Sequence, residues 1–331
     1  MVPPTQKAIV VTGDGIVKVT AAAQNPTDWK TAEYGKRVGA ISGCDFVGIV
    51  VEIGLKVPAN VRSIGERVAG FVHGGLYPNG SFSEYLSVPS EVVVRVPDDW
   101  SDEDAAQLGI APFTAAQTLW SSQENFPTPF APGTDSTPLL VSSGASSVGQ
   151  YVIQFAKLSG FKVITFASPK NFELVRSLGA DEVFDYKDPD ASKKVKEITN
   201  GQLKFAVDTI SEKQTPQQLA DALSDEGGVV SVILPCKTVR DNVKVVHSLA
   251  YDLLGKDFNF PQVFKANEVE TARGKEYARL ITNLLATGKV RPNATTVLPK
   301  GLASVPEGMQ YMRDGKVSGE KITYRISDTP N

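Results

Sequence analysis

From Leu139 to Leu234 the chain alternates short apolar runs of strand length with amphipathic stretches of helix length. The expected strands are residues 139–142, 162–166, 182–184, 205–208 and 228–234. The expected helices between them are residues 148–158, 170–178 and 215–223. Neighbouring parallel strands need a crossover connection, and a helix between successive strands supplies one. The alternation therefore predicts an α/β unit with a doubly wound parallel sheet.

The segments on either side of this unit have the pattern of β-structure. Short β-branched runs separated by Gly, Pro, Asn and Asp predict strands up to Pro97, at residues 8–12, 16–19, 47–53 and 92–96. After an expected helix at 274–286, residues 290–324 return to short strands with one helix at 306–313. A chain of 331 residues is too long for one ordinary core. We therefore expect two domains, a barrel-like one formed by residues 1–115 and 291–331 and an α/β one formed by residues 116–290.

The charge balance argues against a polyanionic partner. Lys and Arg number 34 against 37 Asp and Glu, so the formal net charge of −3 gives no basic field for nucleic acid or anionic lipid. The longest apolar runs are of strand length, and residues 1–7 lack the apolar core of a secretory signal. We therefore expect a cytoplasmic protein that binds a small molecule, without a nucleic-acid or membrane partner.

Cysteine and histidine are too scarce for an ordinary closed zinc site. The sequence holds two of each, Cys44, Cys236, His73 and His247, and they are far apart along the chain. A tetrahedral Cys/His site would need all of them to converge. We therefore expect no metal centre, and the isolated cysteines fit a reducing compartment.

A turn of small residues, Gly144-Ala-Ser-Ser-Val-Gly149, joins the first strand of the α/β unit to its first helix. Such a turn points backbone N–H groups and the positive end of the helix dipole at a pyrophosphate. A glycine pattern alone is weak and could serve packing, but here both the strand and the helix flank it. The sequence therefore predicts dinucleotide binding by Gly144, Ala145, Ser146, Ser147, Val148 and Gly149.

The end of the second strand indicates which dinucleotide binds. NAD sites usually carry a carboxylate about 20 residues downstream of the glycine turn, where it holds the ribose 2′-hydroxyl. This chain has Ser168, Lys170 and Asn171 there instead. These side chains can donate to a 2′-phosphate and none of them repels it, although Lys170 could also be an ordinary solvated lysine. We therefore expect NADPH as the cofactor.

Five motifs occur in the same order as in a known family: Asn25-Pro-Thr-Asp28-Trp-Lys30, Gly43-Cys-Asp-Phe-Val-Gly48, Gly65-Glu-Arg-Val68, Gly144 to Gly149, and Lys316-Val-Ser-Gly-Glu-Lys321. On these residues, nearly the whole chain resembles the zinc-independent medium-chain dehydrogenase/reductases, especially the fungal quinone oxidoreductase-like, trans-acting enoyl reductase and aldehyde reductase proteins. The resemblance implies a GroES-like β-barrel catalytic domain beside a Rossmann domain. Relatives have a longer connection than Asp14-Gly15 after the first strand, so either this loop is short or part of the chain is not represented.

The resemblance also implies further cofactor contacts. Asn25 is similar to an asparagine near the nicotinamide ribose, although the adjacent Pro26 also allows a turn role. Tyr186 resembles a tyrosine that contacts the adenosine phosphate. The remaining implied contacts are Ile210 and Leu234 at strand ends and Ser318, Gly319 and Lys321 in the C-terminal motif.

In zinc-containing members of the family, the position of Asn25 is a cysteine ligand and that of Cys44 a histidine ligand. The resemblance therefore implies zinc-free chemistry, in which hydrogen bonds polarise an enone, an enoyl thioester or a quinone. Lys30 and Tyr34 are the candidate proton donors, with bulk water as a competitor. Thr114 matches a segment beside the nicotinamide, with a capping or packing role as its alternative.

These inferences predict an NADPH-dependent, zinc-independent reductase of an activated C=C bond or quinone. The alternatives are an aldehyde reductase, a trans-acting enoyl reductase that partners a polyketide synthase, and a non-catalytic NADPH-binding, crystallin-like protein. The apolar run at 242–246, late in the α/β sheet, further suggests a homodimer through paired sheet edges.

Overall fold

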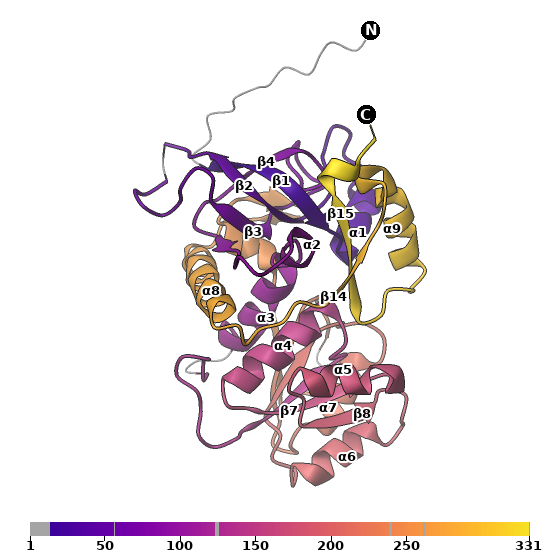
Figure 1. The fold of residues 1–331 in the computed structure, drawn as a ribbon. Helices are drawn as coiled ribbons and strands as arrows, with labels where there is room; N and C mark the ends of the chain where they lie inside the picture. The colour runs from indigo at the N-terminus through magenta and orange to yellow at the C-terminus, as the bar shows by residue number, and fades with distance from the viewer. Residues whose placement is uncertain (1–13, 56, 123–125, 238–239, 261, 331) are drawn as a thin grey trace.

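The computed structural model describes residues 14–330 apart from 56, 123–125, 238–239 and 261. Six described strands form the lower half of the molecule in Figure 1: β6 (Pro138–Ser142), β7 (Lys162–Ala167), β8 (Glu182–Asp185), β9 (Phe205–Asp208), β10 (Gly228–Val232) and β11 (Val243–His247). All their pairings are parallel, in the order β11-β10-β9-β6-β7-β8. The predicted doubly wound α/β sheet is confirmed, although β10 ends two residues earlier than expected.

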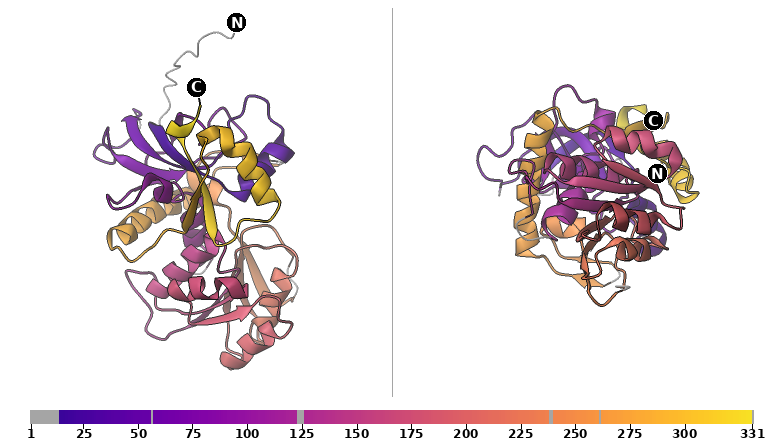
Figure 2. Two further views of the ribbon diagram at one scale, coloured as in Figure 1. Left: turned by 45° about the vertical axis from the view of Figure 1, so that its right-hand side comes forward. Right: turned by 90° about the horizontal axis from the view of Figure 1, so that it is seen from below.

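Helices cover both faces of this sheet (Figure 2). On one face, α4 (Ser147–Leu158) and α5 (Phe172–Ser177) pack on β6 to β8, with α3 (Ile110–Trp120) beside α4. On the other, α7 (Thr215–Ala222) packs on β6 and β9 and contacts α6 (Ala191–Ile198). Successive strand residues face opposite sides, so Leu140 and Ile164 belong to one apolar cluster whereas Val141 and Val163 belong to another.

A second, mostly antiparallel sheet forms the upper half, as the predicted GroES-like lobe requires (Figure 1). Its described strands are β1 (Gly15–Ala23), β2 (Asp45–Glu52), β3 (Arg67–Phe71), β4 (Tyr85–Val88), β5 (Val93–Arg95), β14 (Ala294–Val297) and β15 (Glu320–Arg325). They run in the order β14-β15-β1-β2-β3-β5, with β4 also paired to β1. The strand expected at residues 8–12 lies outside the described residues.

The end of the chain returns to the first sheet, as predicted. β15 pairs antiparallel with β1 and places Tyr324 opposite Ala22, and β14 adds parallel to β15. In Figure 1 these yellow strands reach from the upper half down to α4 and α5. The C-terminal segment therefore lies against both halves, while the domain boundaries at 115/116 and 290/291 stay predictions.

The expectation of β-structure alone before Pro97 is wrong at one place, because α1 (Pro26–Gly35) is a helix. Asn25 precedes it in an extended conformation, and Pro26 takes the first helical turn. The carboxylate of Asp28 accepts the backbone N–H of Asn25 at 2.6 Å. Asparagine followed by proline is a helix-start signal, which the β-branched runs on either side obscured.

Two later helices match the prediction with different bounds. α9 (Val305–Arg313) begins one residue early and packs on α1, whereas α8 (Glu268–Ala286) begins six residues early because Asn267 caps it. The other short elements are α2 (Asp102–Ala105), η1 (Pro169–Asn171), η2 (Ala250–Leu254), β12 (Phe258–Asn259), β13 (Val263–Phe264), η3 (Gly301–Ser304) and η4 (Ile326–Asp328). Within the described part of the chain, no helix has both the length and the apolar character needed to cross a bilayer.

Candidate functional site

The strand order reverses direction between β6 and β9, which pair at the middle of the parallel sheet. The helices that follow these strands, α4 and α7, lie on opposite faces. Their departure opens a crevice at the carboxyl edge of the sheet, which is where dinucleotides bind in folds of this kind. The candidate site is therefore built around the ends of β6 and β9.

The β6–α4 turn presents the start of a helix to this crevice. Ser146 is the N-cap, and its Oγ accepts the backbone N–H of Gly149 at 3.0 Å. The first intrahelical bond is made by Gln150, whose N–H donates to the Ser146 carbonyl. The N–H groups of Ser147 and Val148 precede that bond, so no intrahelical carbonyl can accept them. They are the groups that a pyrophosphate would meet, as the sequence predicts.

Gly144 and Gly149 are required by packing within the protein. A Cβ at Gly144 would lie 2.2 Å from Thr165 Oγ1, and one at Gly149 would lie 2.5 Å from the Ser143 carbonyl oxygen. Both distances are shorter than a van der Waals contact. The glycines thus allow α4 to approach β6 and β7 closely, and they act on phosphate binding through the position of that helix.

The other half of the crevice is fixed by Asp208, which sequence reasoning missed. This buried carboxylate ends β9 and accepts Ser142 Oγ and Thr215 Oγ1, each at 2.8 Å. It also accepts the backbone N–H groups of Ile210 at 3.0 Å and Ser211 at 2.8 Å. The predicted contact Ile210 therefore stands on a tightly held loop at the carboxyl edge. The only signal in the sequence was an aspartate at the end of an apolar run.

The residues predicted to select the dinucleotide lie together at the end of β7. Asn171 Nδ2 donates to Ser168 Oγ at 3.1 Å and to Ser318 Oγ, from the C-terminal motif, at 3.3 Å. A Cβ on Gly319 would lie 3.4 Å from Asn171 Oδ1. Lys170 is exposed beside them. The structure thus joins segments almost 150 residues apart into one cluster of donors.

Two further predicted contacts lie at the same edge. Tyr186 follows β8, and its carbonyl accepts Gln218 Nε2 at 2.7 Å. Leu234 lies two residues beyond the end of β10, in a bend instead of the strand where it was expected. Both positions are compatible with contact to a ligand that lies along the strand ends.

Lys321, another predicted cofactor contact, is buried beside Asn25. Its ammonium donates to Asn25 Oδ1 at 2.6 Å and lies 3.1 Å from Asp45 Oδ2. All three residues are buried. Asp45 Oδ1 also accepts the N–H of Ile110, which starts α3. Burial raises the pKa of Asp45, and the adjacent Lys321 charge opposes that rise most.

The side-chain oxygen of Asn25 is therefore held by Lys321, whereas its side-chain nitrogen is left without an acceptor. Its Nδ2 is buried and makes no hydrogen bond of acceptable geometry, although the amide lies close enough to Asp45 to lower that residue's pKa. An unsatisfied buried donor is costly unless a ligand or water completes it. This orphan donor fits the predicted contact between Asn25 and a bound nucleotide.

Beside this cluster, a row of polar groups joins η2 to α1 and to the residue before β2. The Tyr251 hydroxyl, from η2, lies 3.2 Å from Cys44 Sγ and 2.9 Å from Thr27 Oγ1. Burial raises the pKa values of Cys44 and Tyr251, so both stay protonated near neutral pH. Burial also raises the pKa of Asp28 to about 7. Within the described residues no group of three or more Cys, His, Asp or Glu could hold a metal ion.

The predicted catalytic residues differ in their surroundings. Lys30 Nζ lies 3.0 Å from Glu212 Oε1, on the loop that follows β9. Tyr34, one turn further along α1, is 66% exposed, so its hydroxyl is not set in a water-excluded site. Thr114 is buried in α3, four residues after the N–H that Asp45 holds. Lys30 is thus the one predicted donor that the structure connects to the other half.

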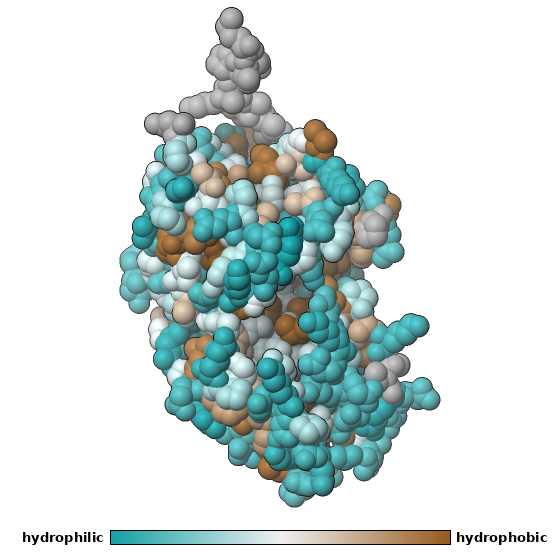
Figure 3. Space-filling model, turned by 90° about the vertical axis from the view of Figure 1, so that its right-hand side faces the viewer, coloured by the Kyte–Doolittle hydropathy of each residue, from teal (hydrophilic) through white to brown (hydrophobic). Residues whose placement is uncertain are grey.

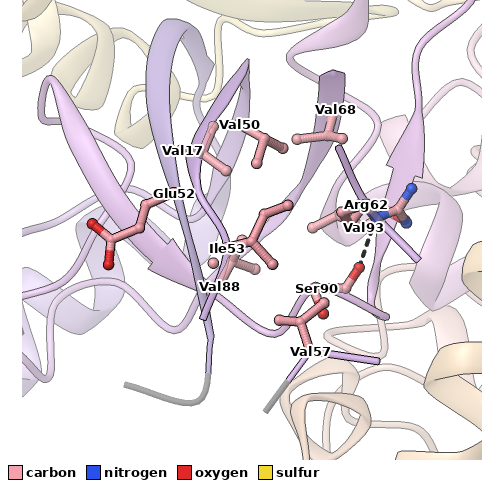
Figure 4. A pocket seen from close by; sticks show the side chains of 11 residues that line it. Val17, Val50, Glu52, Ile53, Val57, Arg62, Val68, Val88, Ser90 and Val93 are labelled. Atoms are coloured by element: carbon pink, nitrogen blue, oxygen red, sulfur yellow. Dashed lines mark hydrogen bonds between the residues drawn. The ribbon is translucent and has the colours of Figure 1, made fainter. Parts of the chain in front are cut away.

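One cavity inside the upper sheet does not compete with this region as a substrate site. It is lined mainly by valines such as Val17 and Val68 (Figure 4), and its volume is near 10 Å³. A cavity of this volume has room for about one water molecule and is too small for a substrate. In Figure 3 the surface is hollowed between the two halves, with apolar residues inside the hollow.

Known proteins are similar to this chain over most of its length. The family model described as the alcohol dehydrogenase GroES-like domain matches residues 12–98, and the one described as zinc-binding dehydrogenase matches residues 147–265. A trans-enoyl reductase of Alternaria alternata is 37% identical, over 94% of this chain and 91% of its own length. A trans-enoyl reductase of a Fusarium species is 33% identical, over 96% and 92%.

Solved structures show the same fold at lower identity. The CurK enoyl reductase has a TM-score of 0.74 at 19% identity, covering 97% of this chain and 93% of its own. A mycobacterial quinone oxidoreductase has a TM-score of 0.75 at 20% identity, covering 97% and 94%. A mycobacterial protein solved in complex with NADPH has a TM-score of 0.75 at 21% identity, covering 97% and 94%.

Proposed function

Because the chain belongs to the medium-chain dehydrogenase/reductase superfamily, together with the fungal trans-enoyl reductases, we propose that it reduces the activated C=C bond of an enoyl compound with NADPH. It is an oxidoreductase with a pyridine-nucleotide-binding fold. The finer choices of nucleotide and substrate rest on the residues of the site. An enone or quinone is a chemically related acceptor, since each takes a hydride at a carbon conjugated to a carbonyl.

The choice of NADPH is supported by the donor cluster at the end of β7. Ser168 and Lys170 offer a hydroxyl and a cation to a 2′-phosphate, and Asn171, whose amide donates to Ser168 and Ser318, orients the two hydroxyls. No carboxylate stands among residues 168–171 to pair with a ribose 2′-hydroxyl. The free N–H groups at the start of α4 suit the pyrophosphate of either nucleotide. Discrimination is therefore expected to come from the 2′ position.

Bound NADPH would supply the hydride, and the chain's own residues would orient the acceptor and manage the proton. The Lys30 ammonium is the best placed of the proposed donors to hydrogen-bond a carbonyl oxygen as negative charge develops there. Thr114 and the Asn25 amide would shape the nicotinamide side of the site. Water from the hollow between the two halves remains the competing proton source.

Zinc-free chemistry is supported by the donor set at the family's metal position. Asn25 is committed to Lys321, and the Cys44 thiol, with its raised pKa, stays protonated against Tyr251. Metal binding requires a deprotonated thiolate and further ligands. An amide and a buried neutral thiol are poor substitutes. Carbonyl polarisation is thus assigned to hydrogen bonds.

The proposal depends mainly on one arrangement. The free N–H groups of Ser147 and Val148 at the start of α4 face the crevice between β6 and β9, and the Lys30–Glu212 contact lies across the same crevice. The test supplies NADPH carrying two deuterium atoms at the nicotinamide C4 and a short enoyl thioester. We expect one deuterium at the β-carbon of the saturated product, and a solvent-derived hydrogen at the α-carbon. Deuterium found on an alcohol carbon, formed from an aldehyde control, would instead support the aldehyde reductase reading.

Two partners are proposed on narrower grounds. The relatives are named trans-enoyl reductases, which supports the alternative of a trans-acting enoyl reductase that partners a polyketide synthase, beside the proposed action on a free molecule.

A homodimer is proposed on separate grounds. β11 lies at the edge of the parallel sheet, and pairing of two such edges would join two copies of the chain. Sedimentation at micromolar concentration tests the dimer, since a single monomeric species would exclude it. A cytoplasmic location remains our prediction.

A further inference from the structure

The contact between Lys30 and Glu212 joins the two halves of the molecule at the crevice. Lys30 belongs to α1 of the upper half, and Glu212 to the loop between β9 and α7 of the lower half. Their atoms are 3.0 Å apart, and their side chains are 34% and 48% exposed. The pair is therefore accessible to a ligand and is only partly shielded from water.

The loop that carries Glu212 is held firmly on both sides of it. Ser211 and Lys213, its two neighbours, both have positive φ, at 60° and 57°. Non-glycine residues adopt this conformation only where surrounding contacts enforce it. Ser211 supplies such contacts, because its N–H donates to Asp208 and its Oγ accepts the Ile233 N–H at 3.0 Å. The backbone of Glu212 is thus held at the strand end, and its side chain reaches Lys30 from there.

The negative charge of the Glu212 carboxylate offsets the positive charge of the Lys30 ammonium. The Trp29 ring, whose centroid lies 5.8 Å from the ammonium, carries no net charge. Deeper in the site, the buried acid Asp45 is already paired with Lys321. A substrate carbonyl that reaches Lys30 would therefore meet an ammonium with a spare hydrogen-bond donor but little net charge. A carboxylate would meet Glu212 as well.

We propose that Glu212 is a positioning and specificity residue, which holds the Lys30 ammonium at the crevice and makes the site accept neutral acyl thioesters over free carboxylates. This inference rests on the proposed role of Lys30 in acyl reduction. Specificity of this kind comes from a repulsive element set against the wrong ligand, in addition to attraction of the right one. The Glu212 carboxylate is that element.

The test compares two inhibitors that differ in charge, hexanoate and its N-acetylcysteamine thioester, in competition with an enoyl thioester substrate. Glu212→Gln keeps the shape of the side chain and removes its charge. We expect the inhibition constant of hexanoate to fall about threefold, the size of one partly exposed charge contact, while that of the thioester does not fall. Glu212→Asp should restore the preference of the original protein. The shift for hexanoate should shrink in high salt.

A matched control is Glu33→Gln, because Glu33 lies on the same helix and pairs with Arg313 at 3.0 Å with similar exposure. It should leave both inhibition constants unchanged. An unchanged constant for hexanoate in Glu212→Gln, or an equal change for both inhibitors, would overturn the inference while leaving enoyl reduction intact. Lys30→Met with an undiminished turnover number would overturn the role of Lys30 and the inference with it. Folding is checked by the melting temperature and by NADPH affinity.

Discussion

Lys321 places its ammonium 2.6 Å from the side-chain oxygen of Asn25, although 296 residues separate the two along the chain. The same ammonium meets Asp45 of β2, whose other oxygen holds the start of α3. One buried cation thus fixes the C-terminal strand, the start of α1 and the helix that carries Thr114. Two segments far apart in the sequence are thus joined through the site.

Removing this cation should destabilise the protein strongly. Lys321→Met leaves the Asp45 carboxylate buried without its partner, which typically costs about 3–5 kcal/mol. Chemical denaturation measures the loss. Lys321→Met combined with Asp45→Asn should recover part of it, because no uncompensated charge remains. A loss below about 1 kcal/mol for the single variant would mean that the pair is solvated and does not organise the site.

The pH dependence of stability should depend on Asp28. Burial raises its pKa from 3.8 to about 7, so between these values the folded state keeps a proton that the unfolded state has released. This contribution is fully present below pH 3.8 and is lost as pH rises through 7, by about 4 kcal/mol in total.

Asp28→Asn keeps an oxygen to accept the Asn25 N–H and removes the titration. The unfolding free energy of this variant should fall less between pH 4 and pH 7 than that of the original protein. The comparison of the two proteins cancels the contribution of the other acids. Parallel stability profiles would show that Asp28 is ionised in the folded state.

The donor cluster at the end of β7 predicts the nucleotide preference. Lys170→Ala should weaken NADPH binding about fivefold, the effect of one exposed charge contact, and leave NADH binding unchanged. Ser168→Asp should go further and reverse the preference, since it adds the carboxylate that NAD sites use. Fluorescence titration of both nucleotides measures each constant. Equal losses for NADPH and NADH in Lys170→Ala would place the 2′-phosphate elsewhere.

The packing role of Gly144 is separable from phosphate binding. Gly144→Ala brings a Cβ within 2.2 Å of Thr165 Oγ1, and overpacking of this kind costs about 1–3 kcal/mol. Adding Thr165→Ala removes the clashing oxygen, so the double variant should lose less stability than the sum of the two single ones. Strict additivity in this double-mutant cycle would show that the two positions do not touch.

The parallel sheet and its glycine turn could be predicted because their signals are local. An apolar run, a Gly144 turn and an amphipathic helix lie within 20 residues of one another, and each constrains the next. Helix α1 was missed for a related reason, since the Asn25-Pro26 start signal is two residues long and stands among β-branched runs. The expected strand 228–234 was too long, because the apolar pattern continues to Leu234 whereas the strand β10 ends at Val232.

The charged partnerships of the site could not be predicted in this way. Lys321 and Asp45 meet only after the C-terminal strand joins β1, and Glu212 reaches Lys30 only after both halves have formed. In the sequence, Glu212 has the appearance of a surface residue in a polar loop. Asp208 is similar, because its role depends on gathering two backbone N–H groups and two hydroxyls from separate elements. These contacts form only in the tertiary structure, and a single sequence does not show which distant residues will meet.

The most direct test of the central claim is the rate of NADPH oxidation by the purified protein, compared with NADH, against a short enoyl thioester, a quinone and an aromatic aldehyde. We expect turnover with NADPH, at a higher kcat/KM than with NADH, on the enoyl thioester and on the quinone as a related acceptor. Turnover confined to the aldehyde, or tight NADPH binding without any turnover, would contradict it.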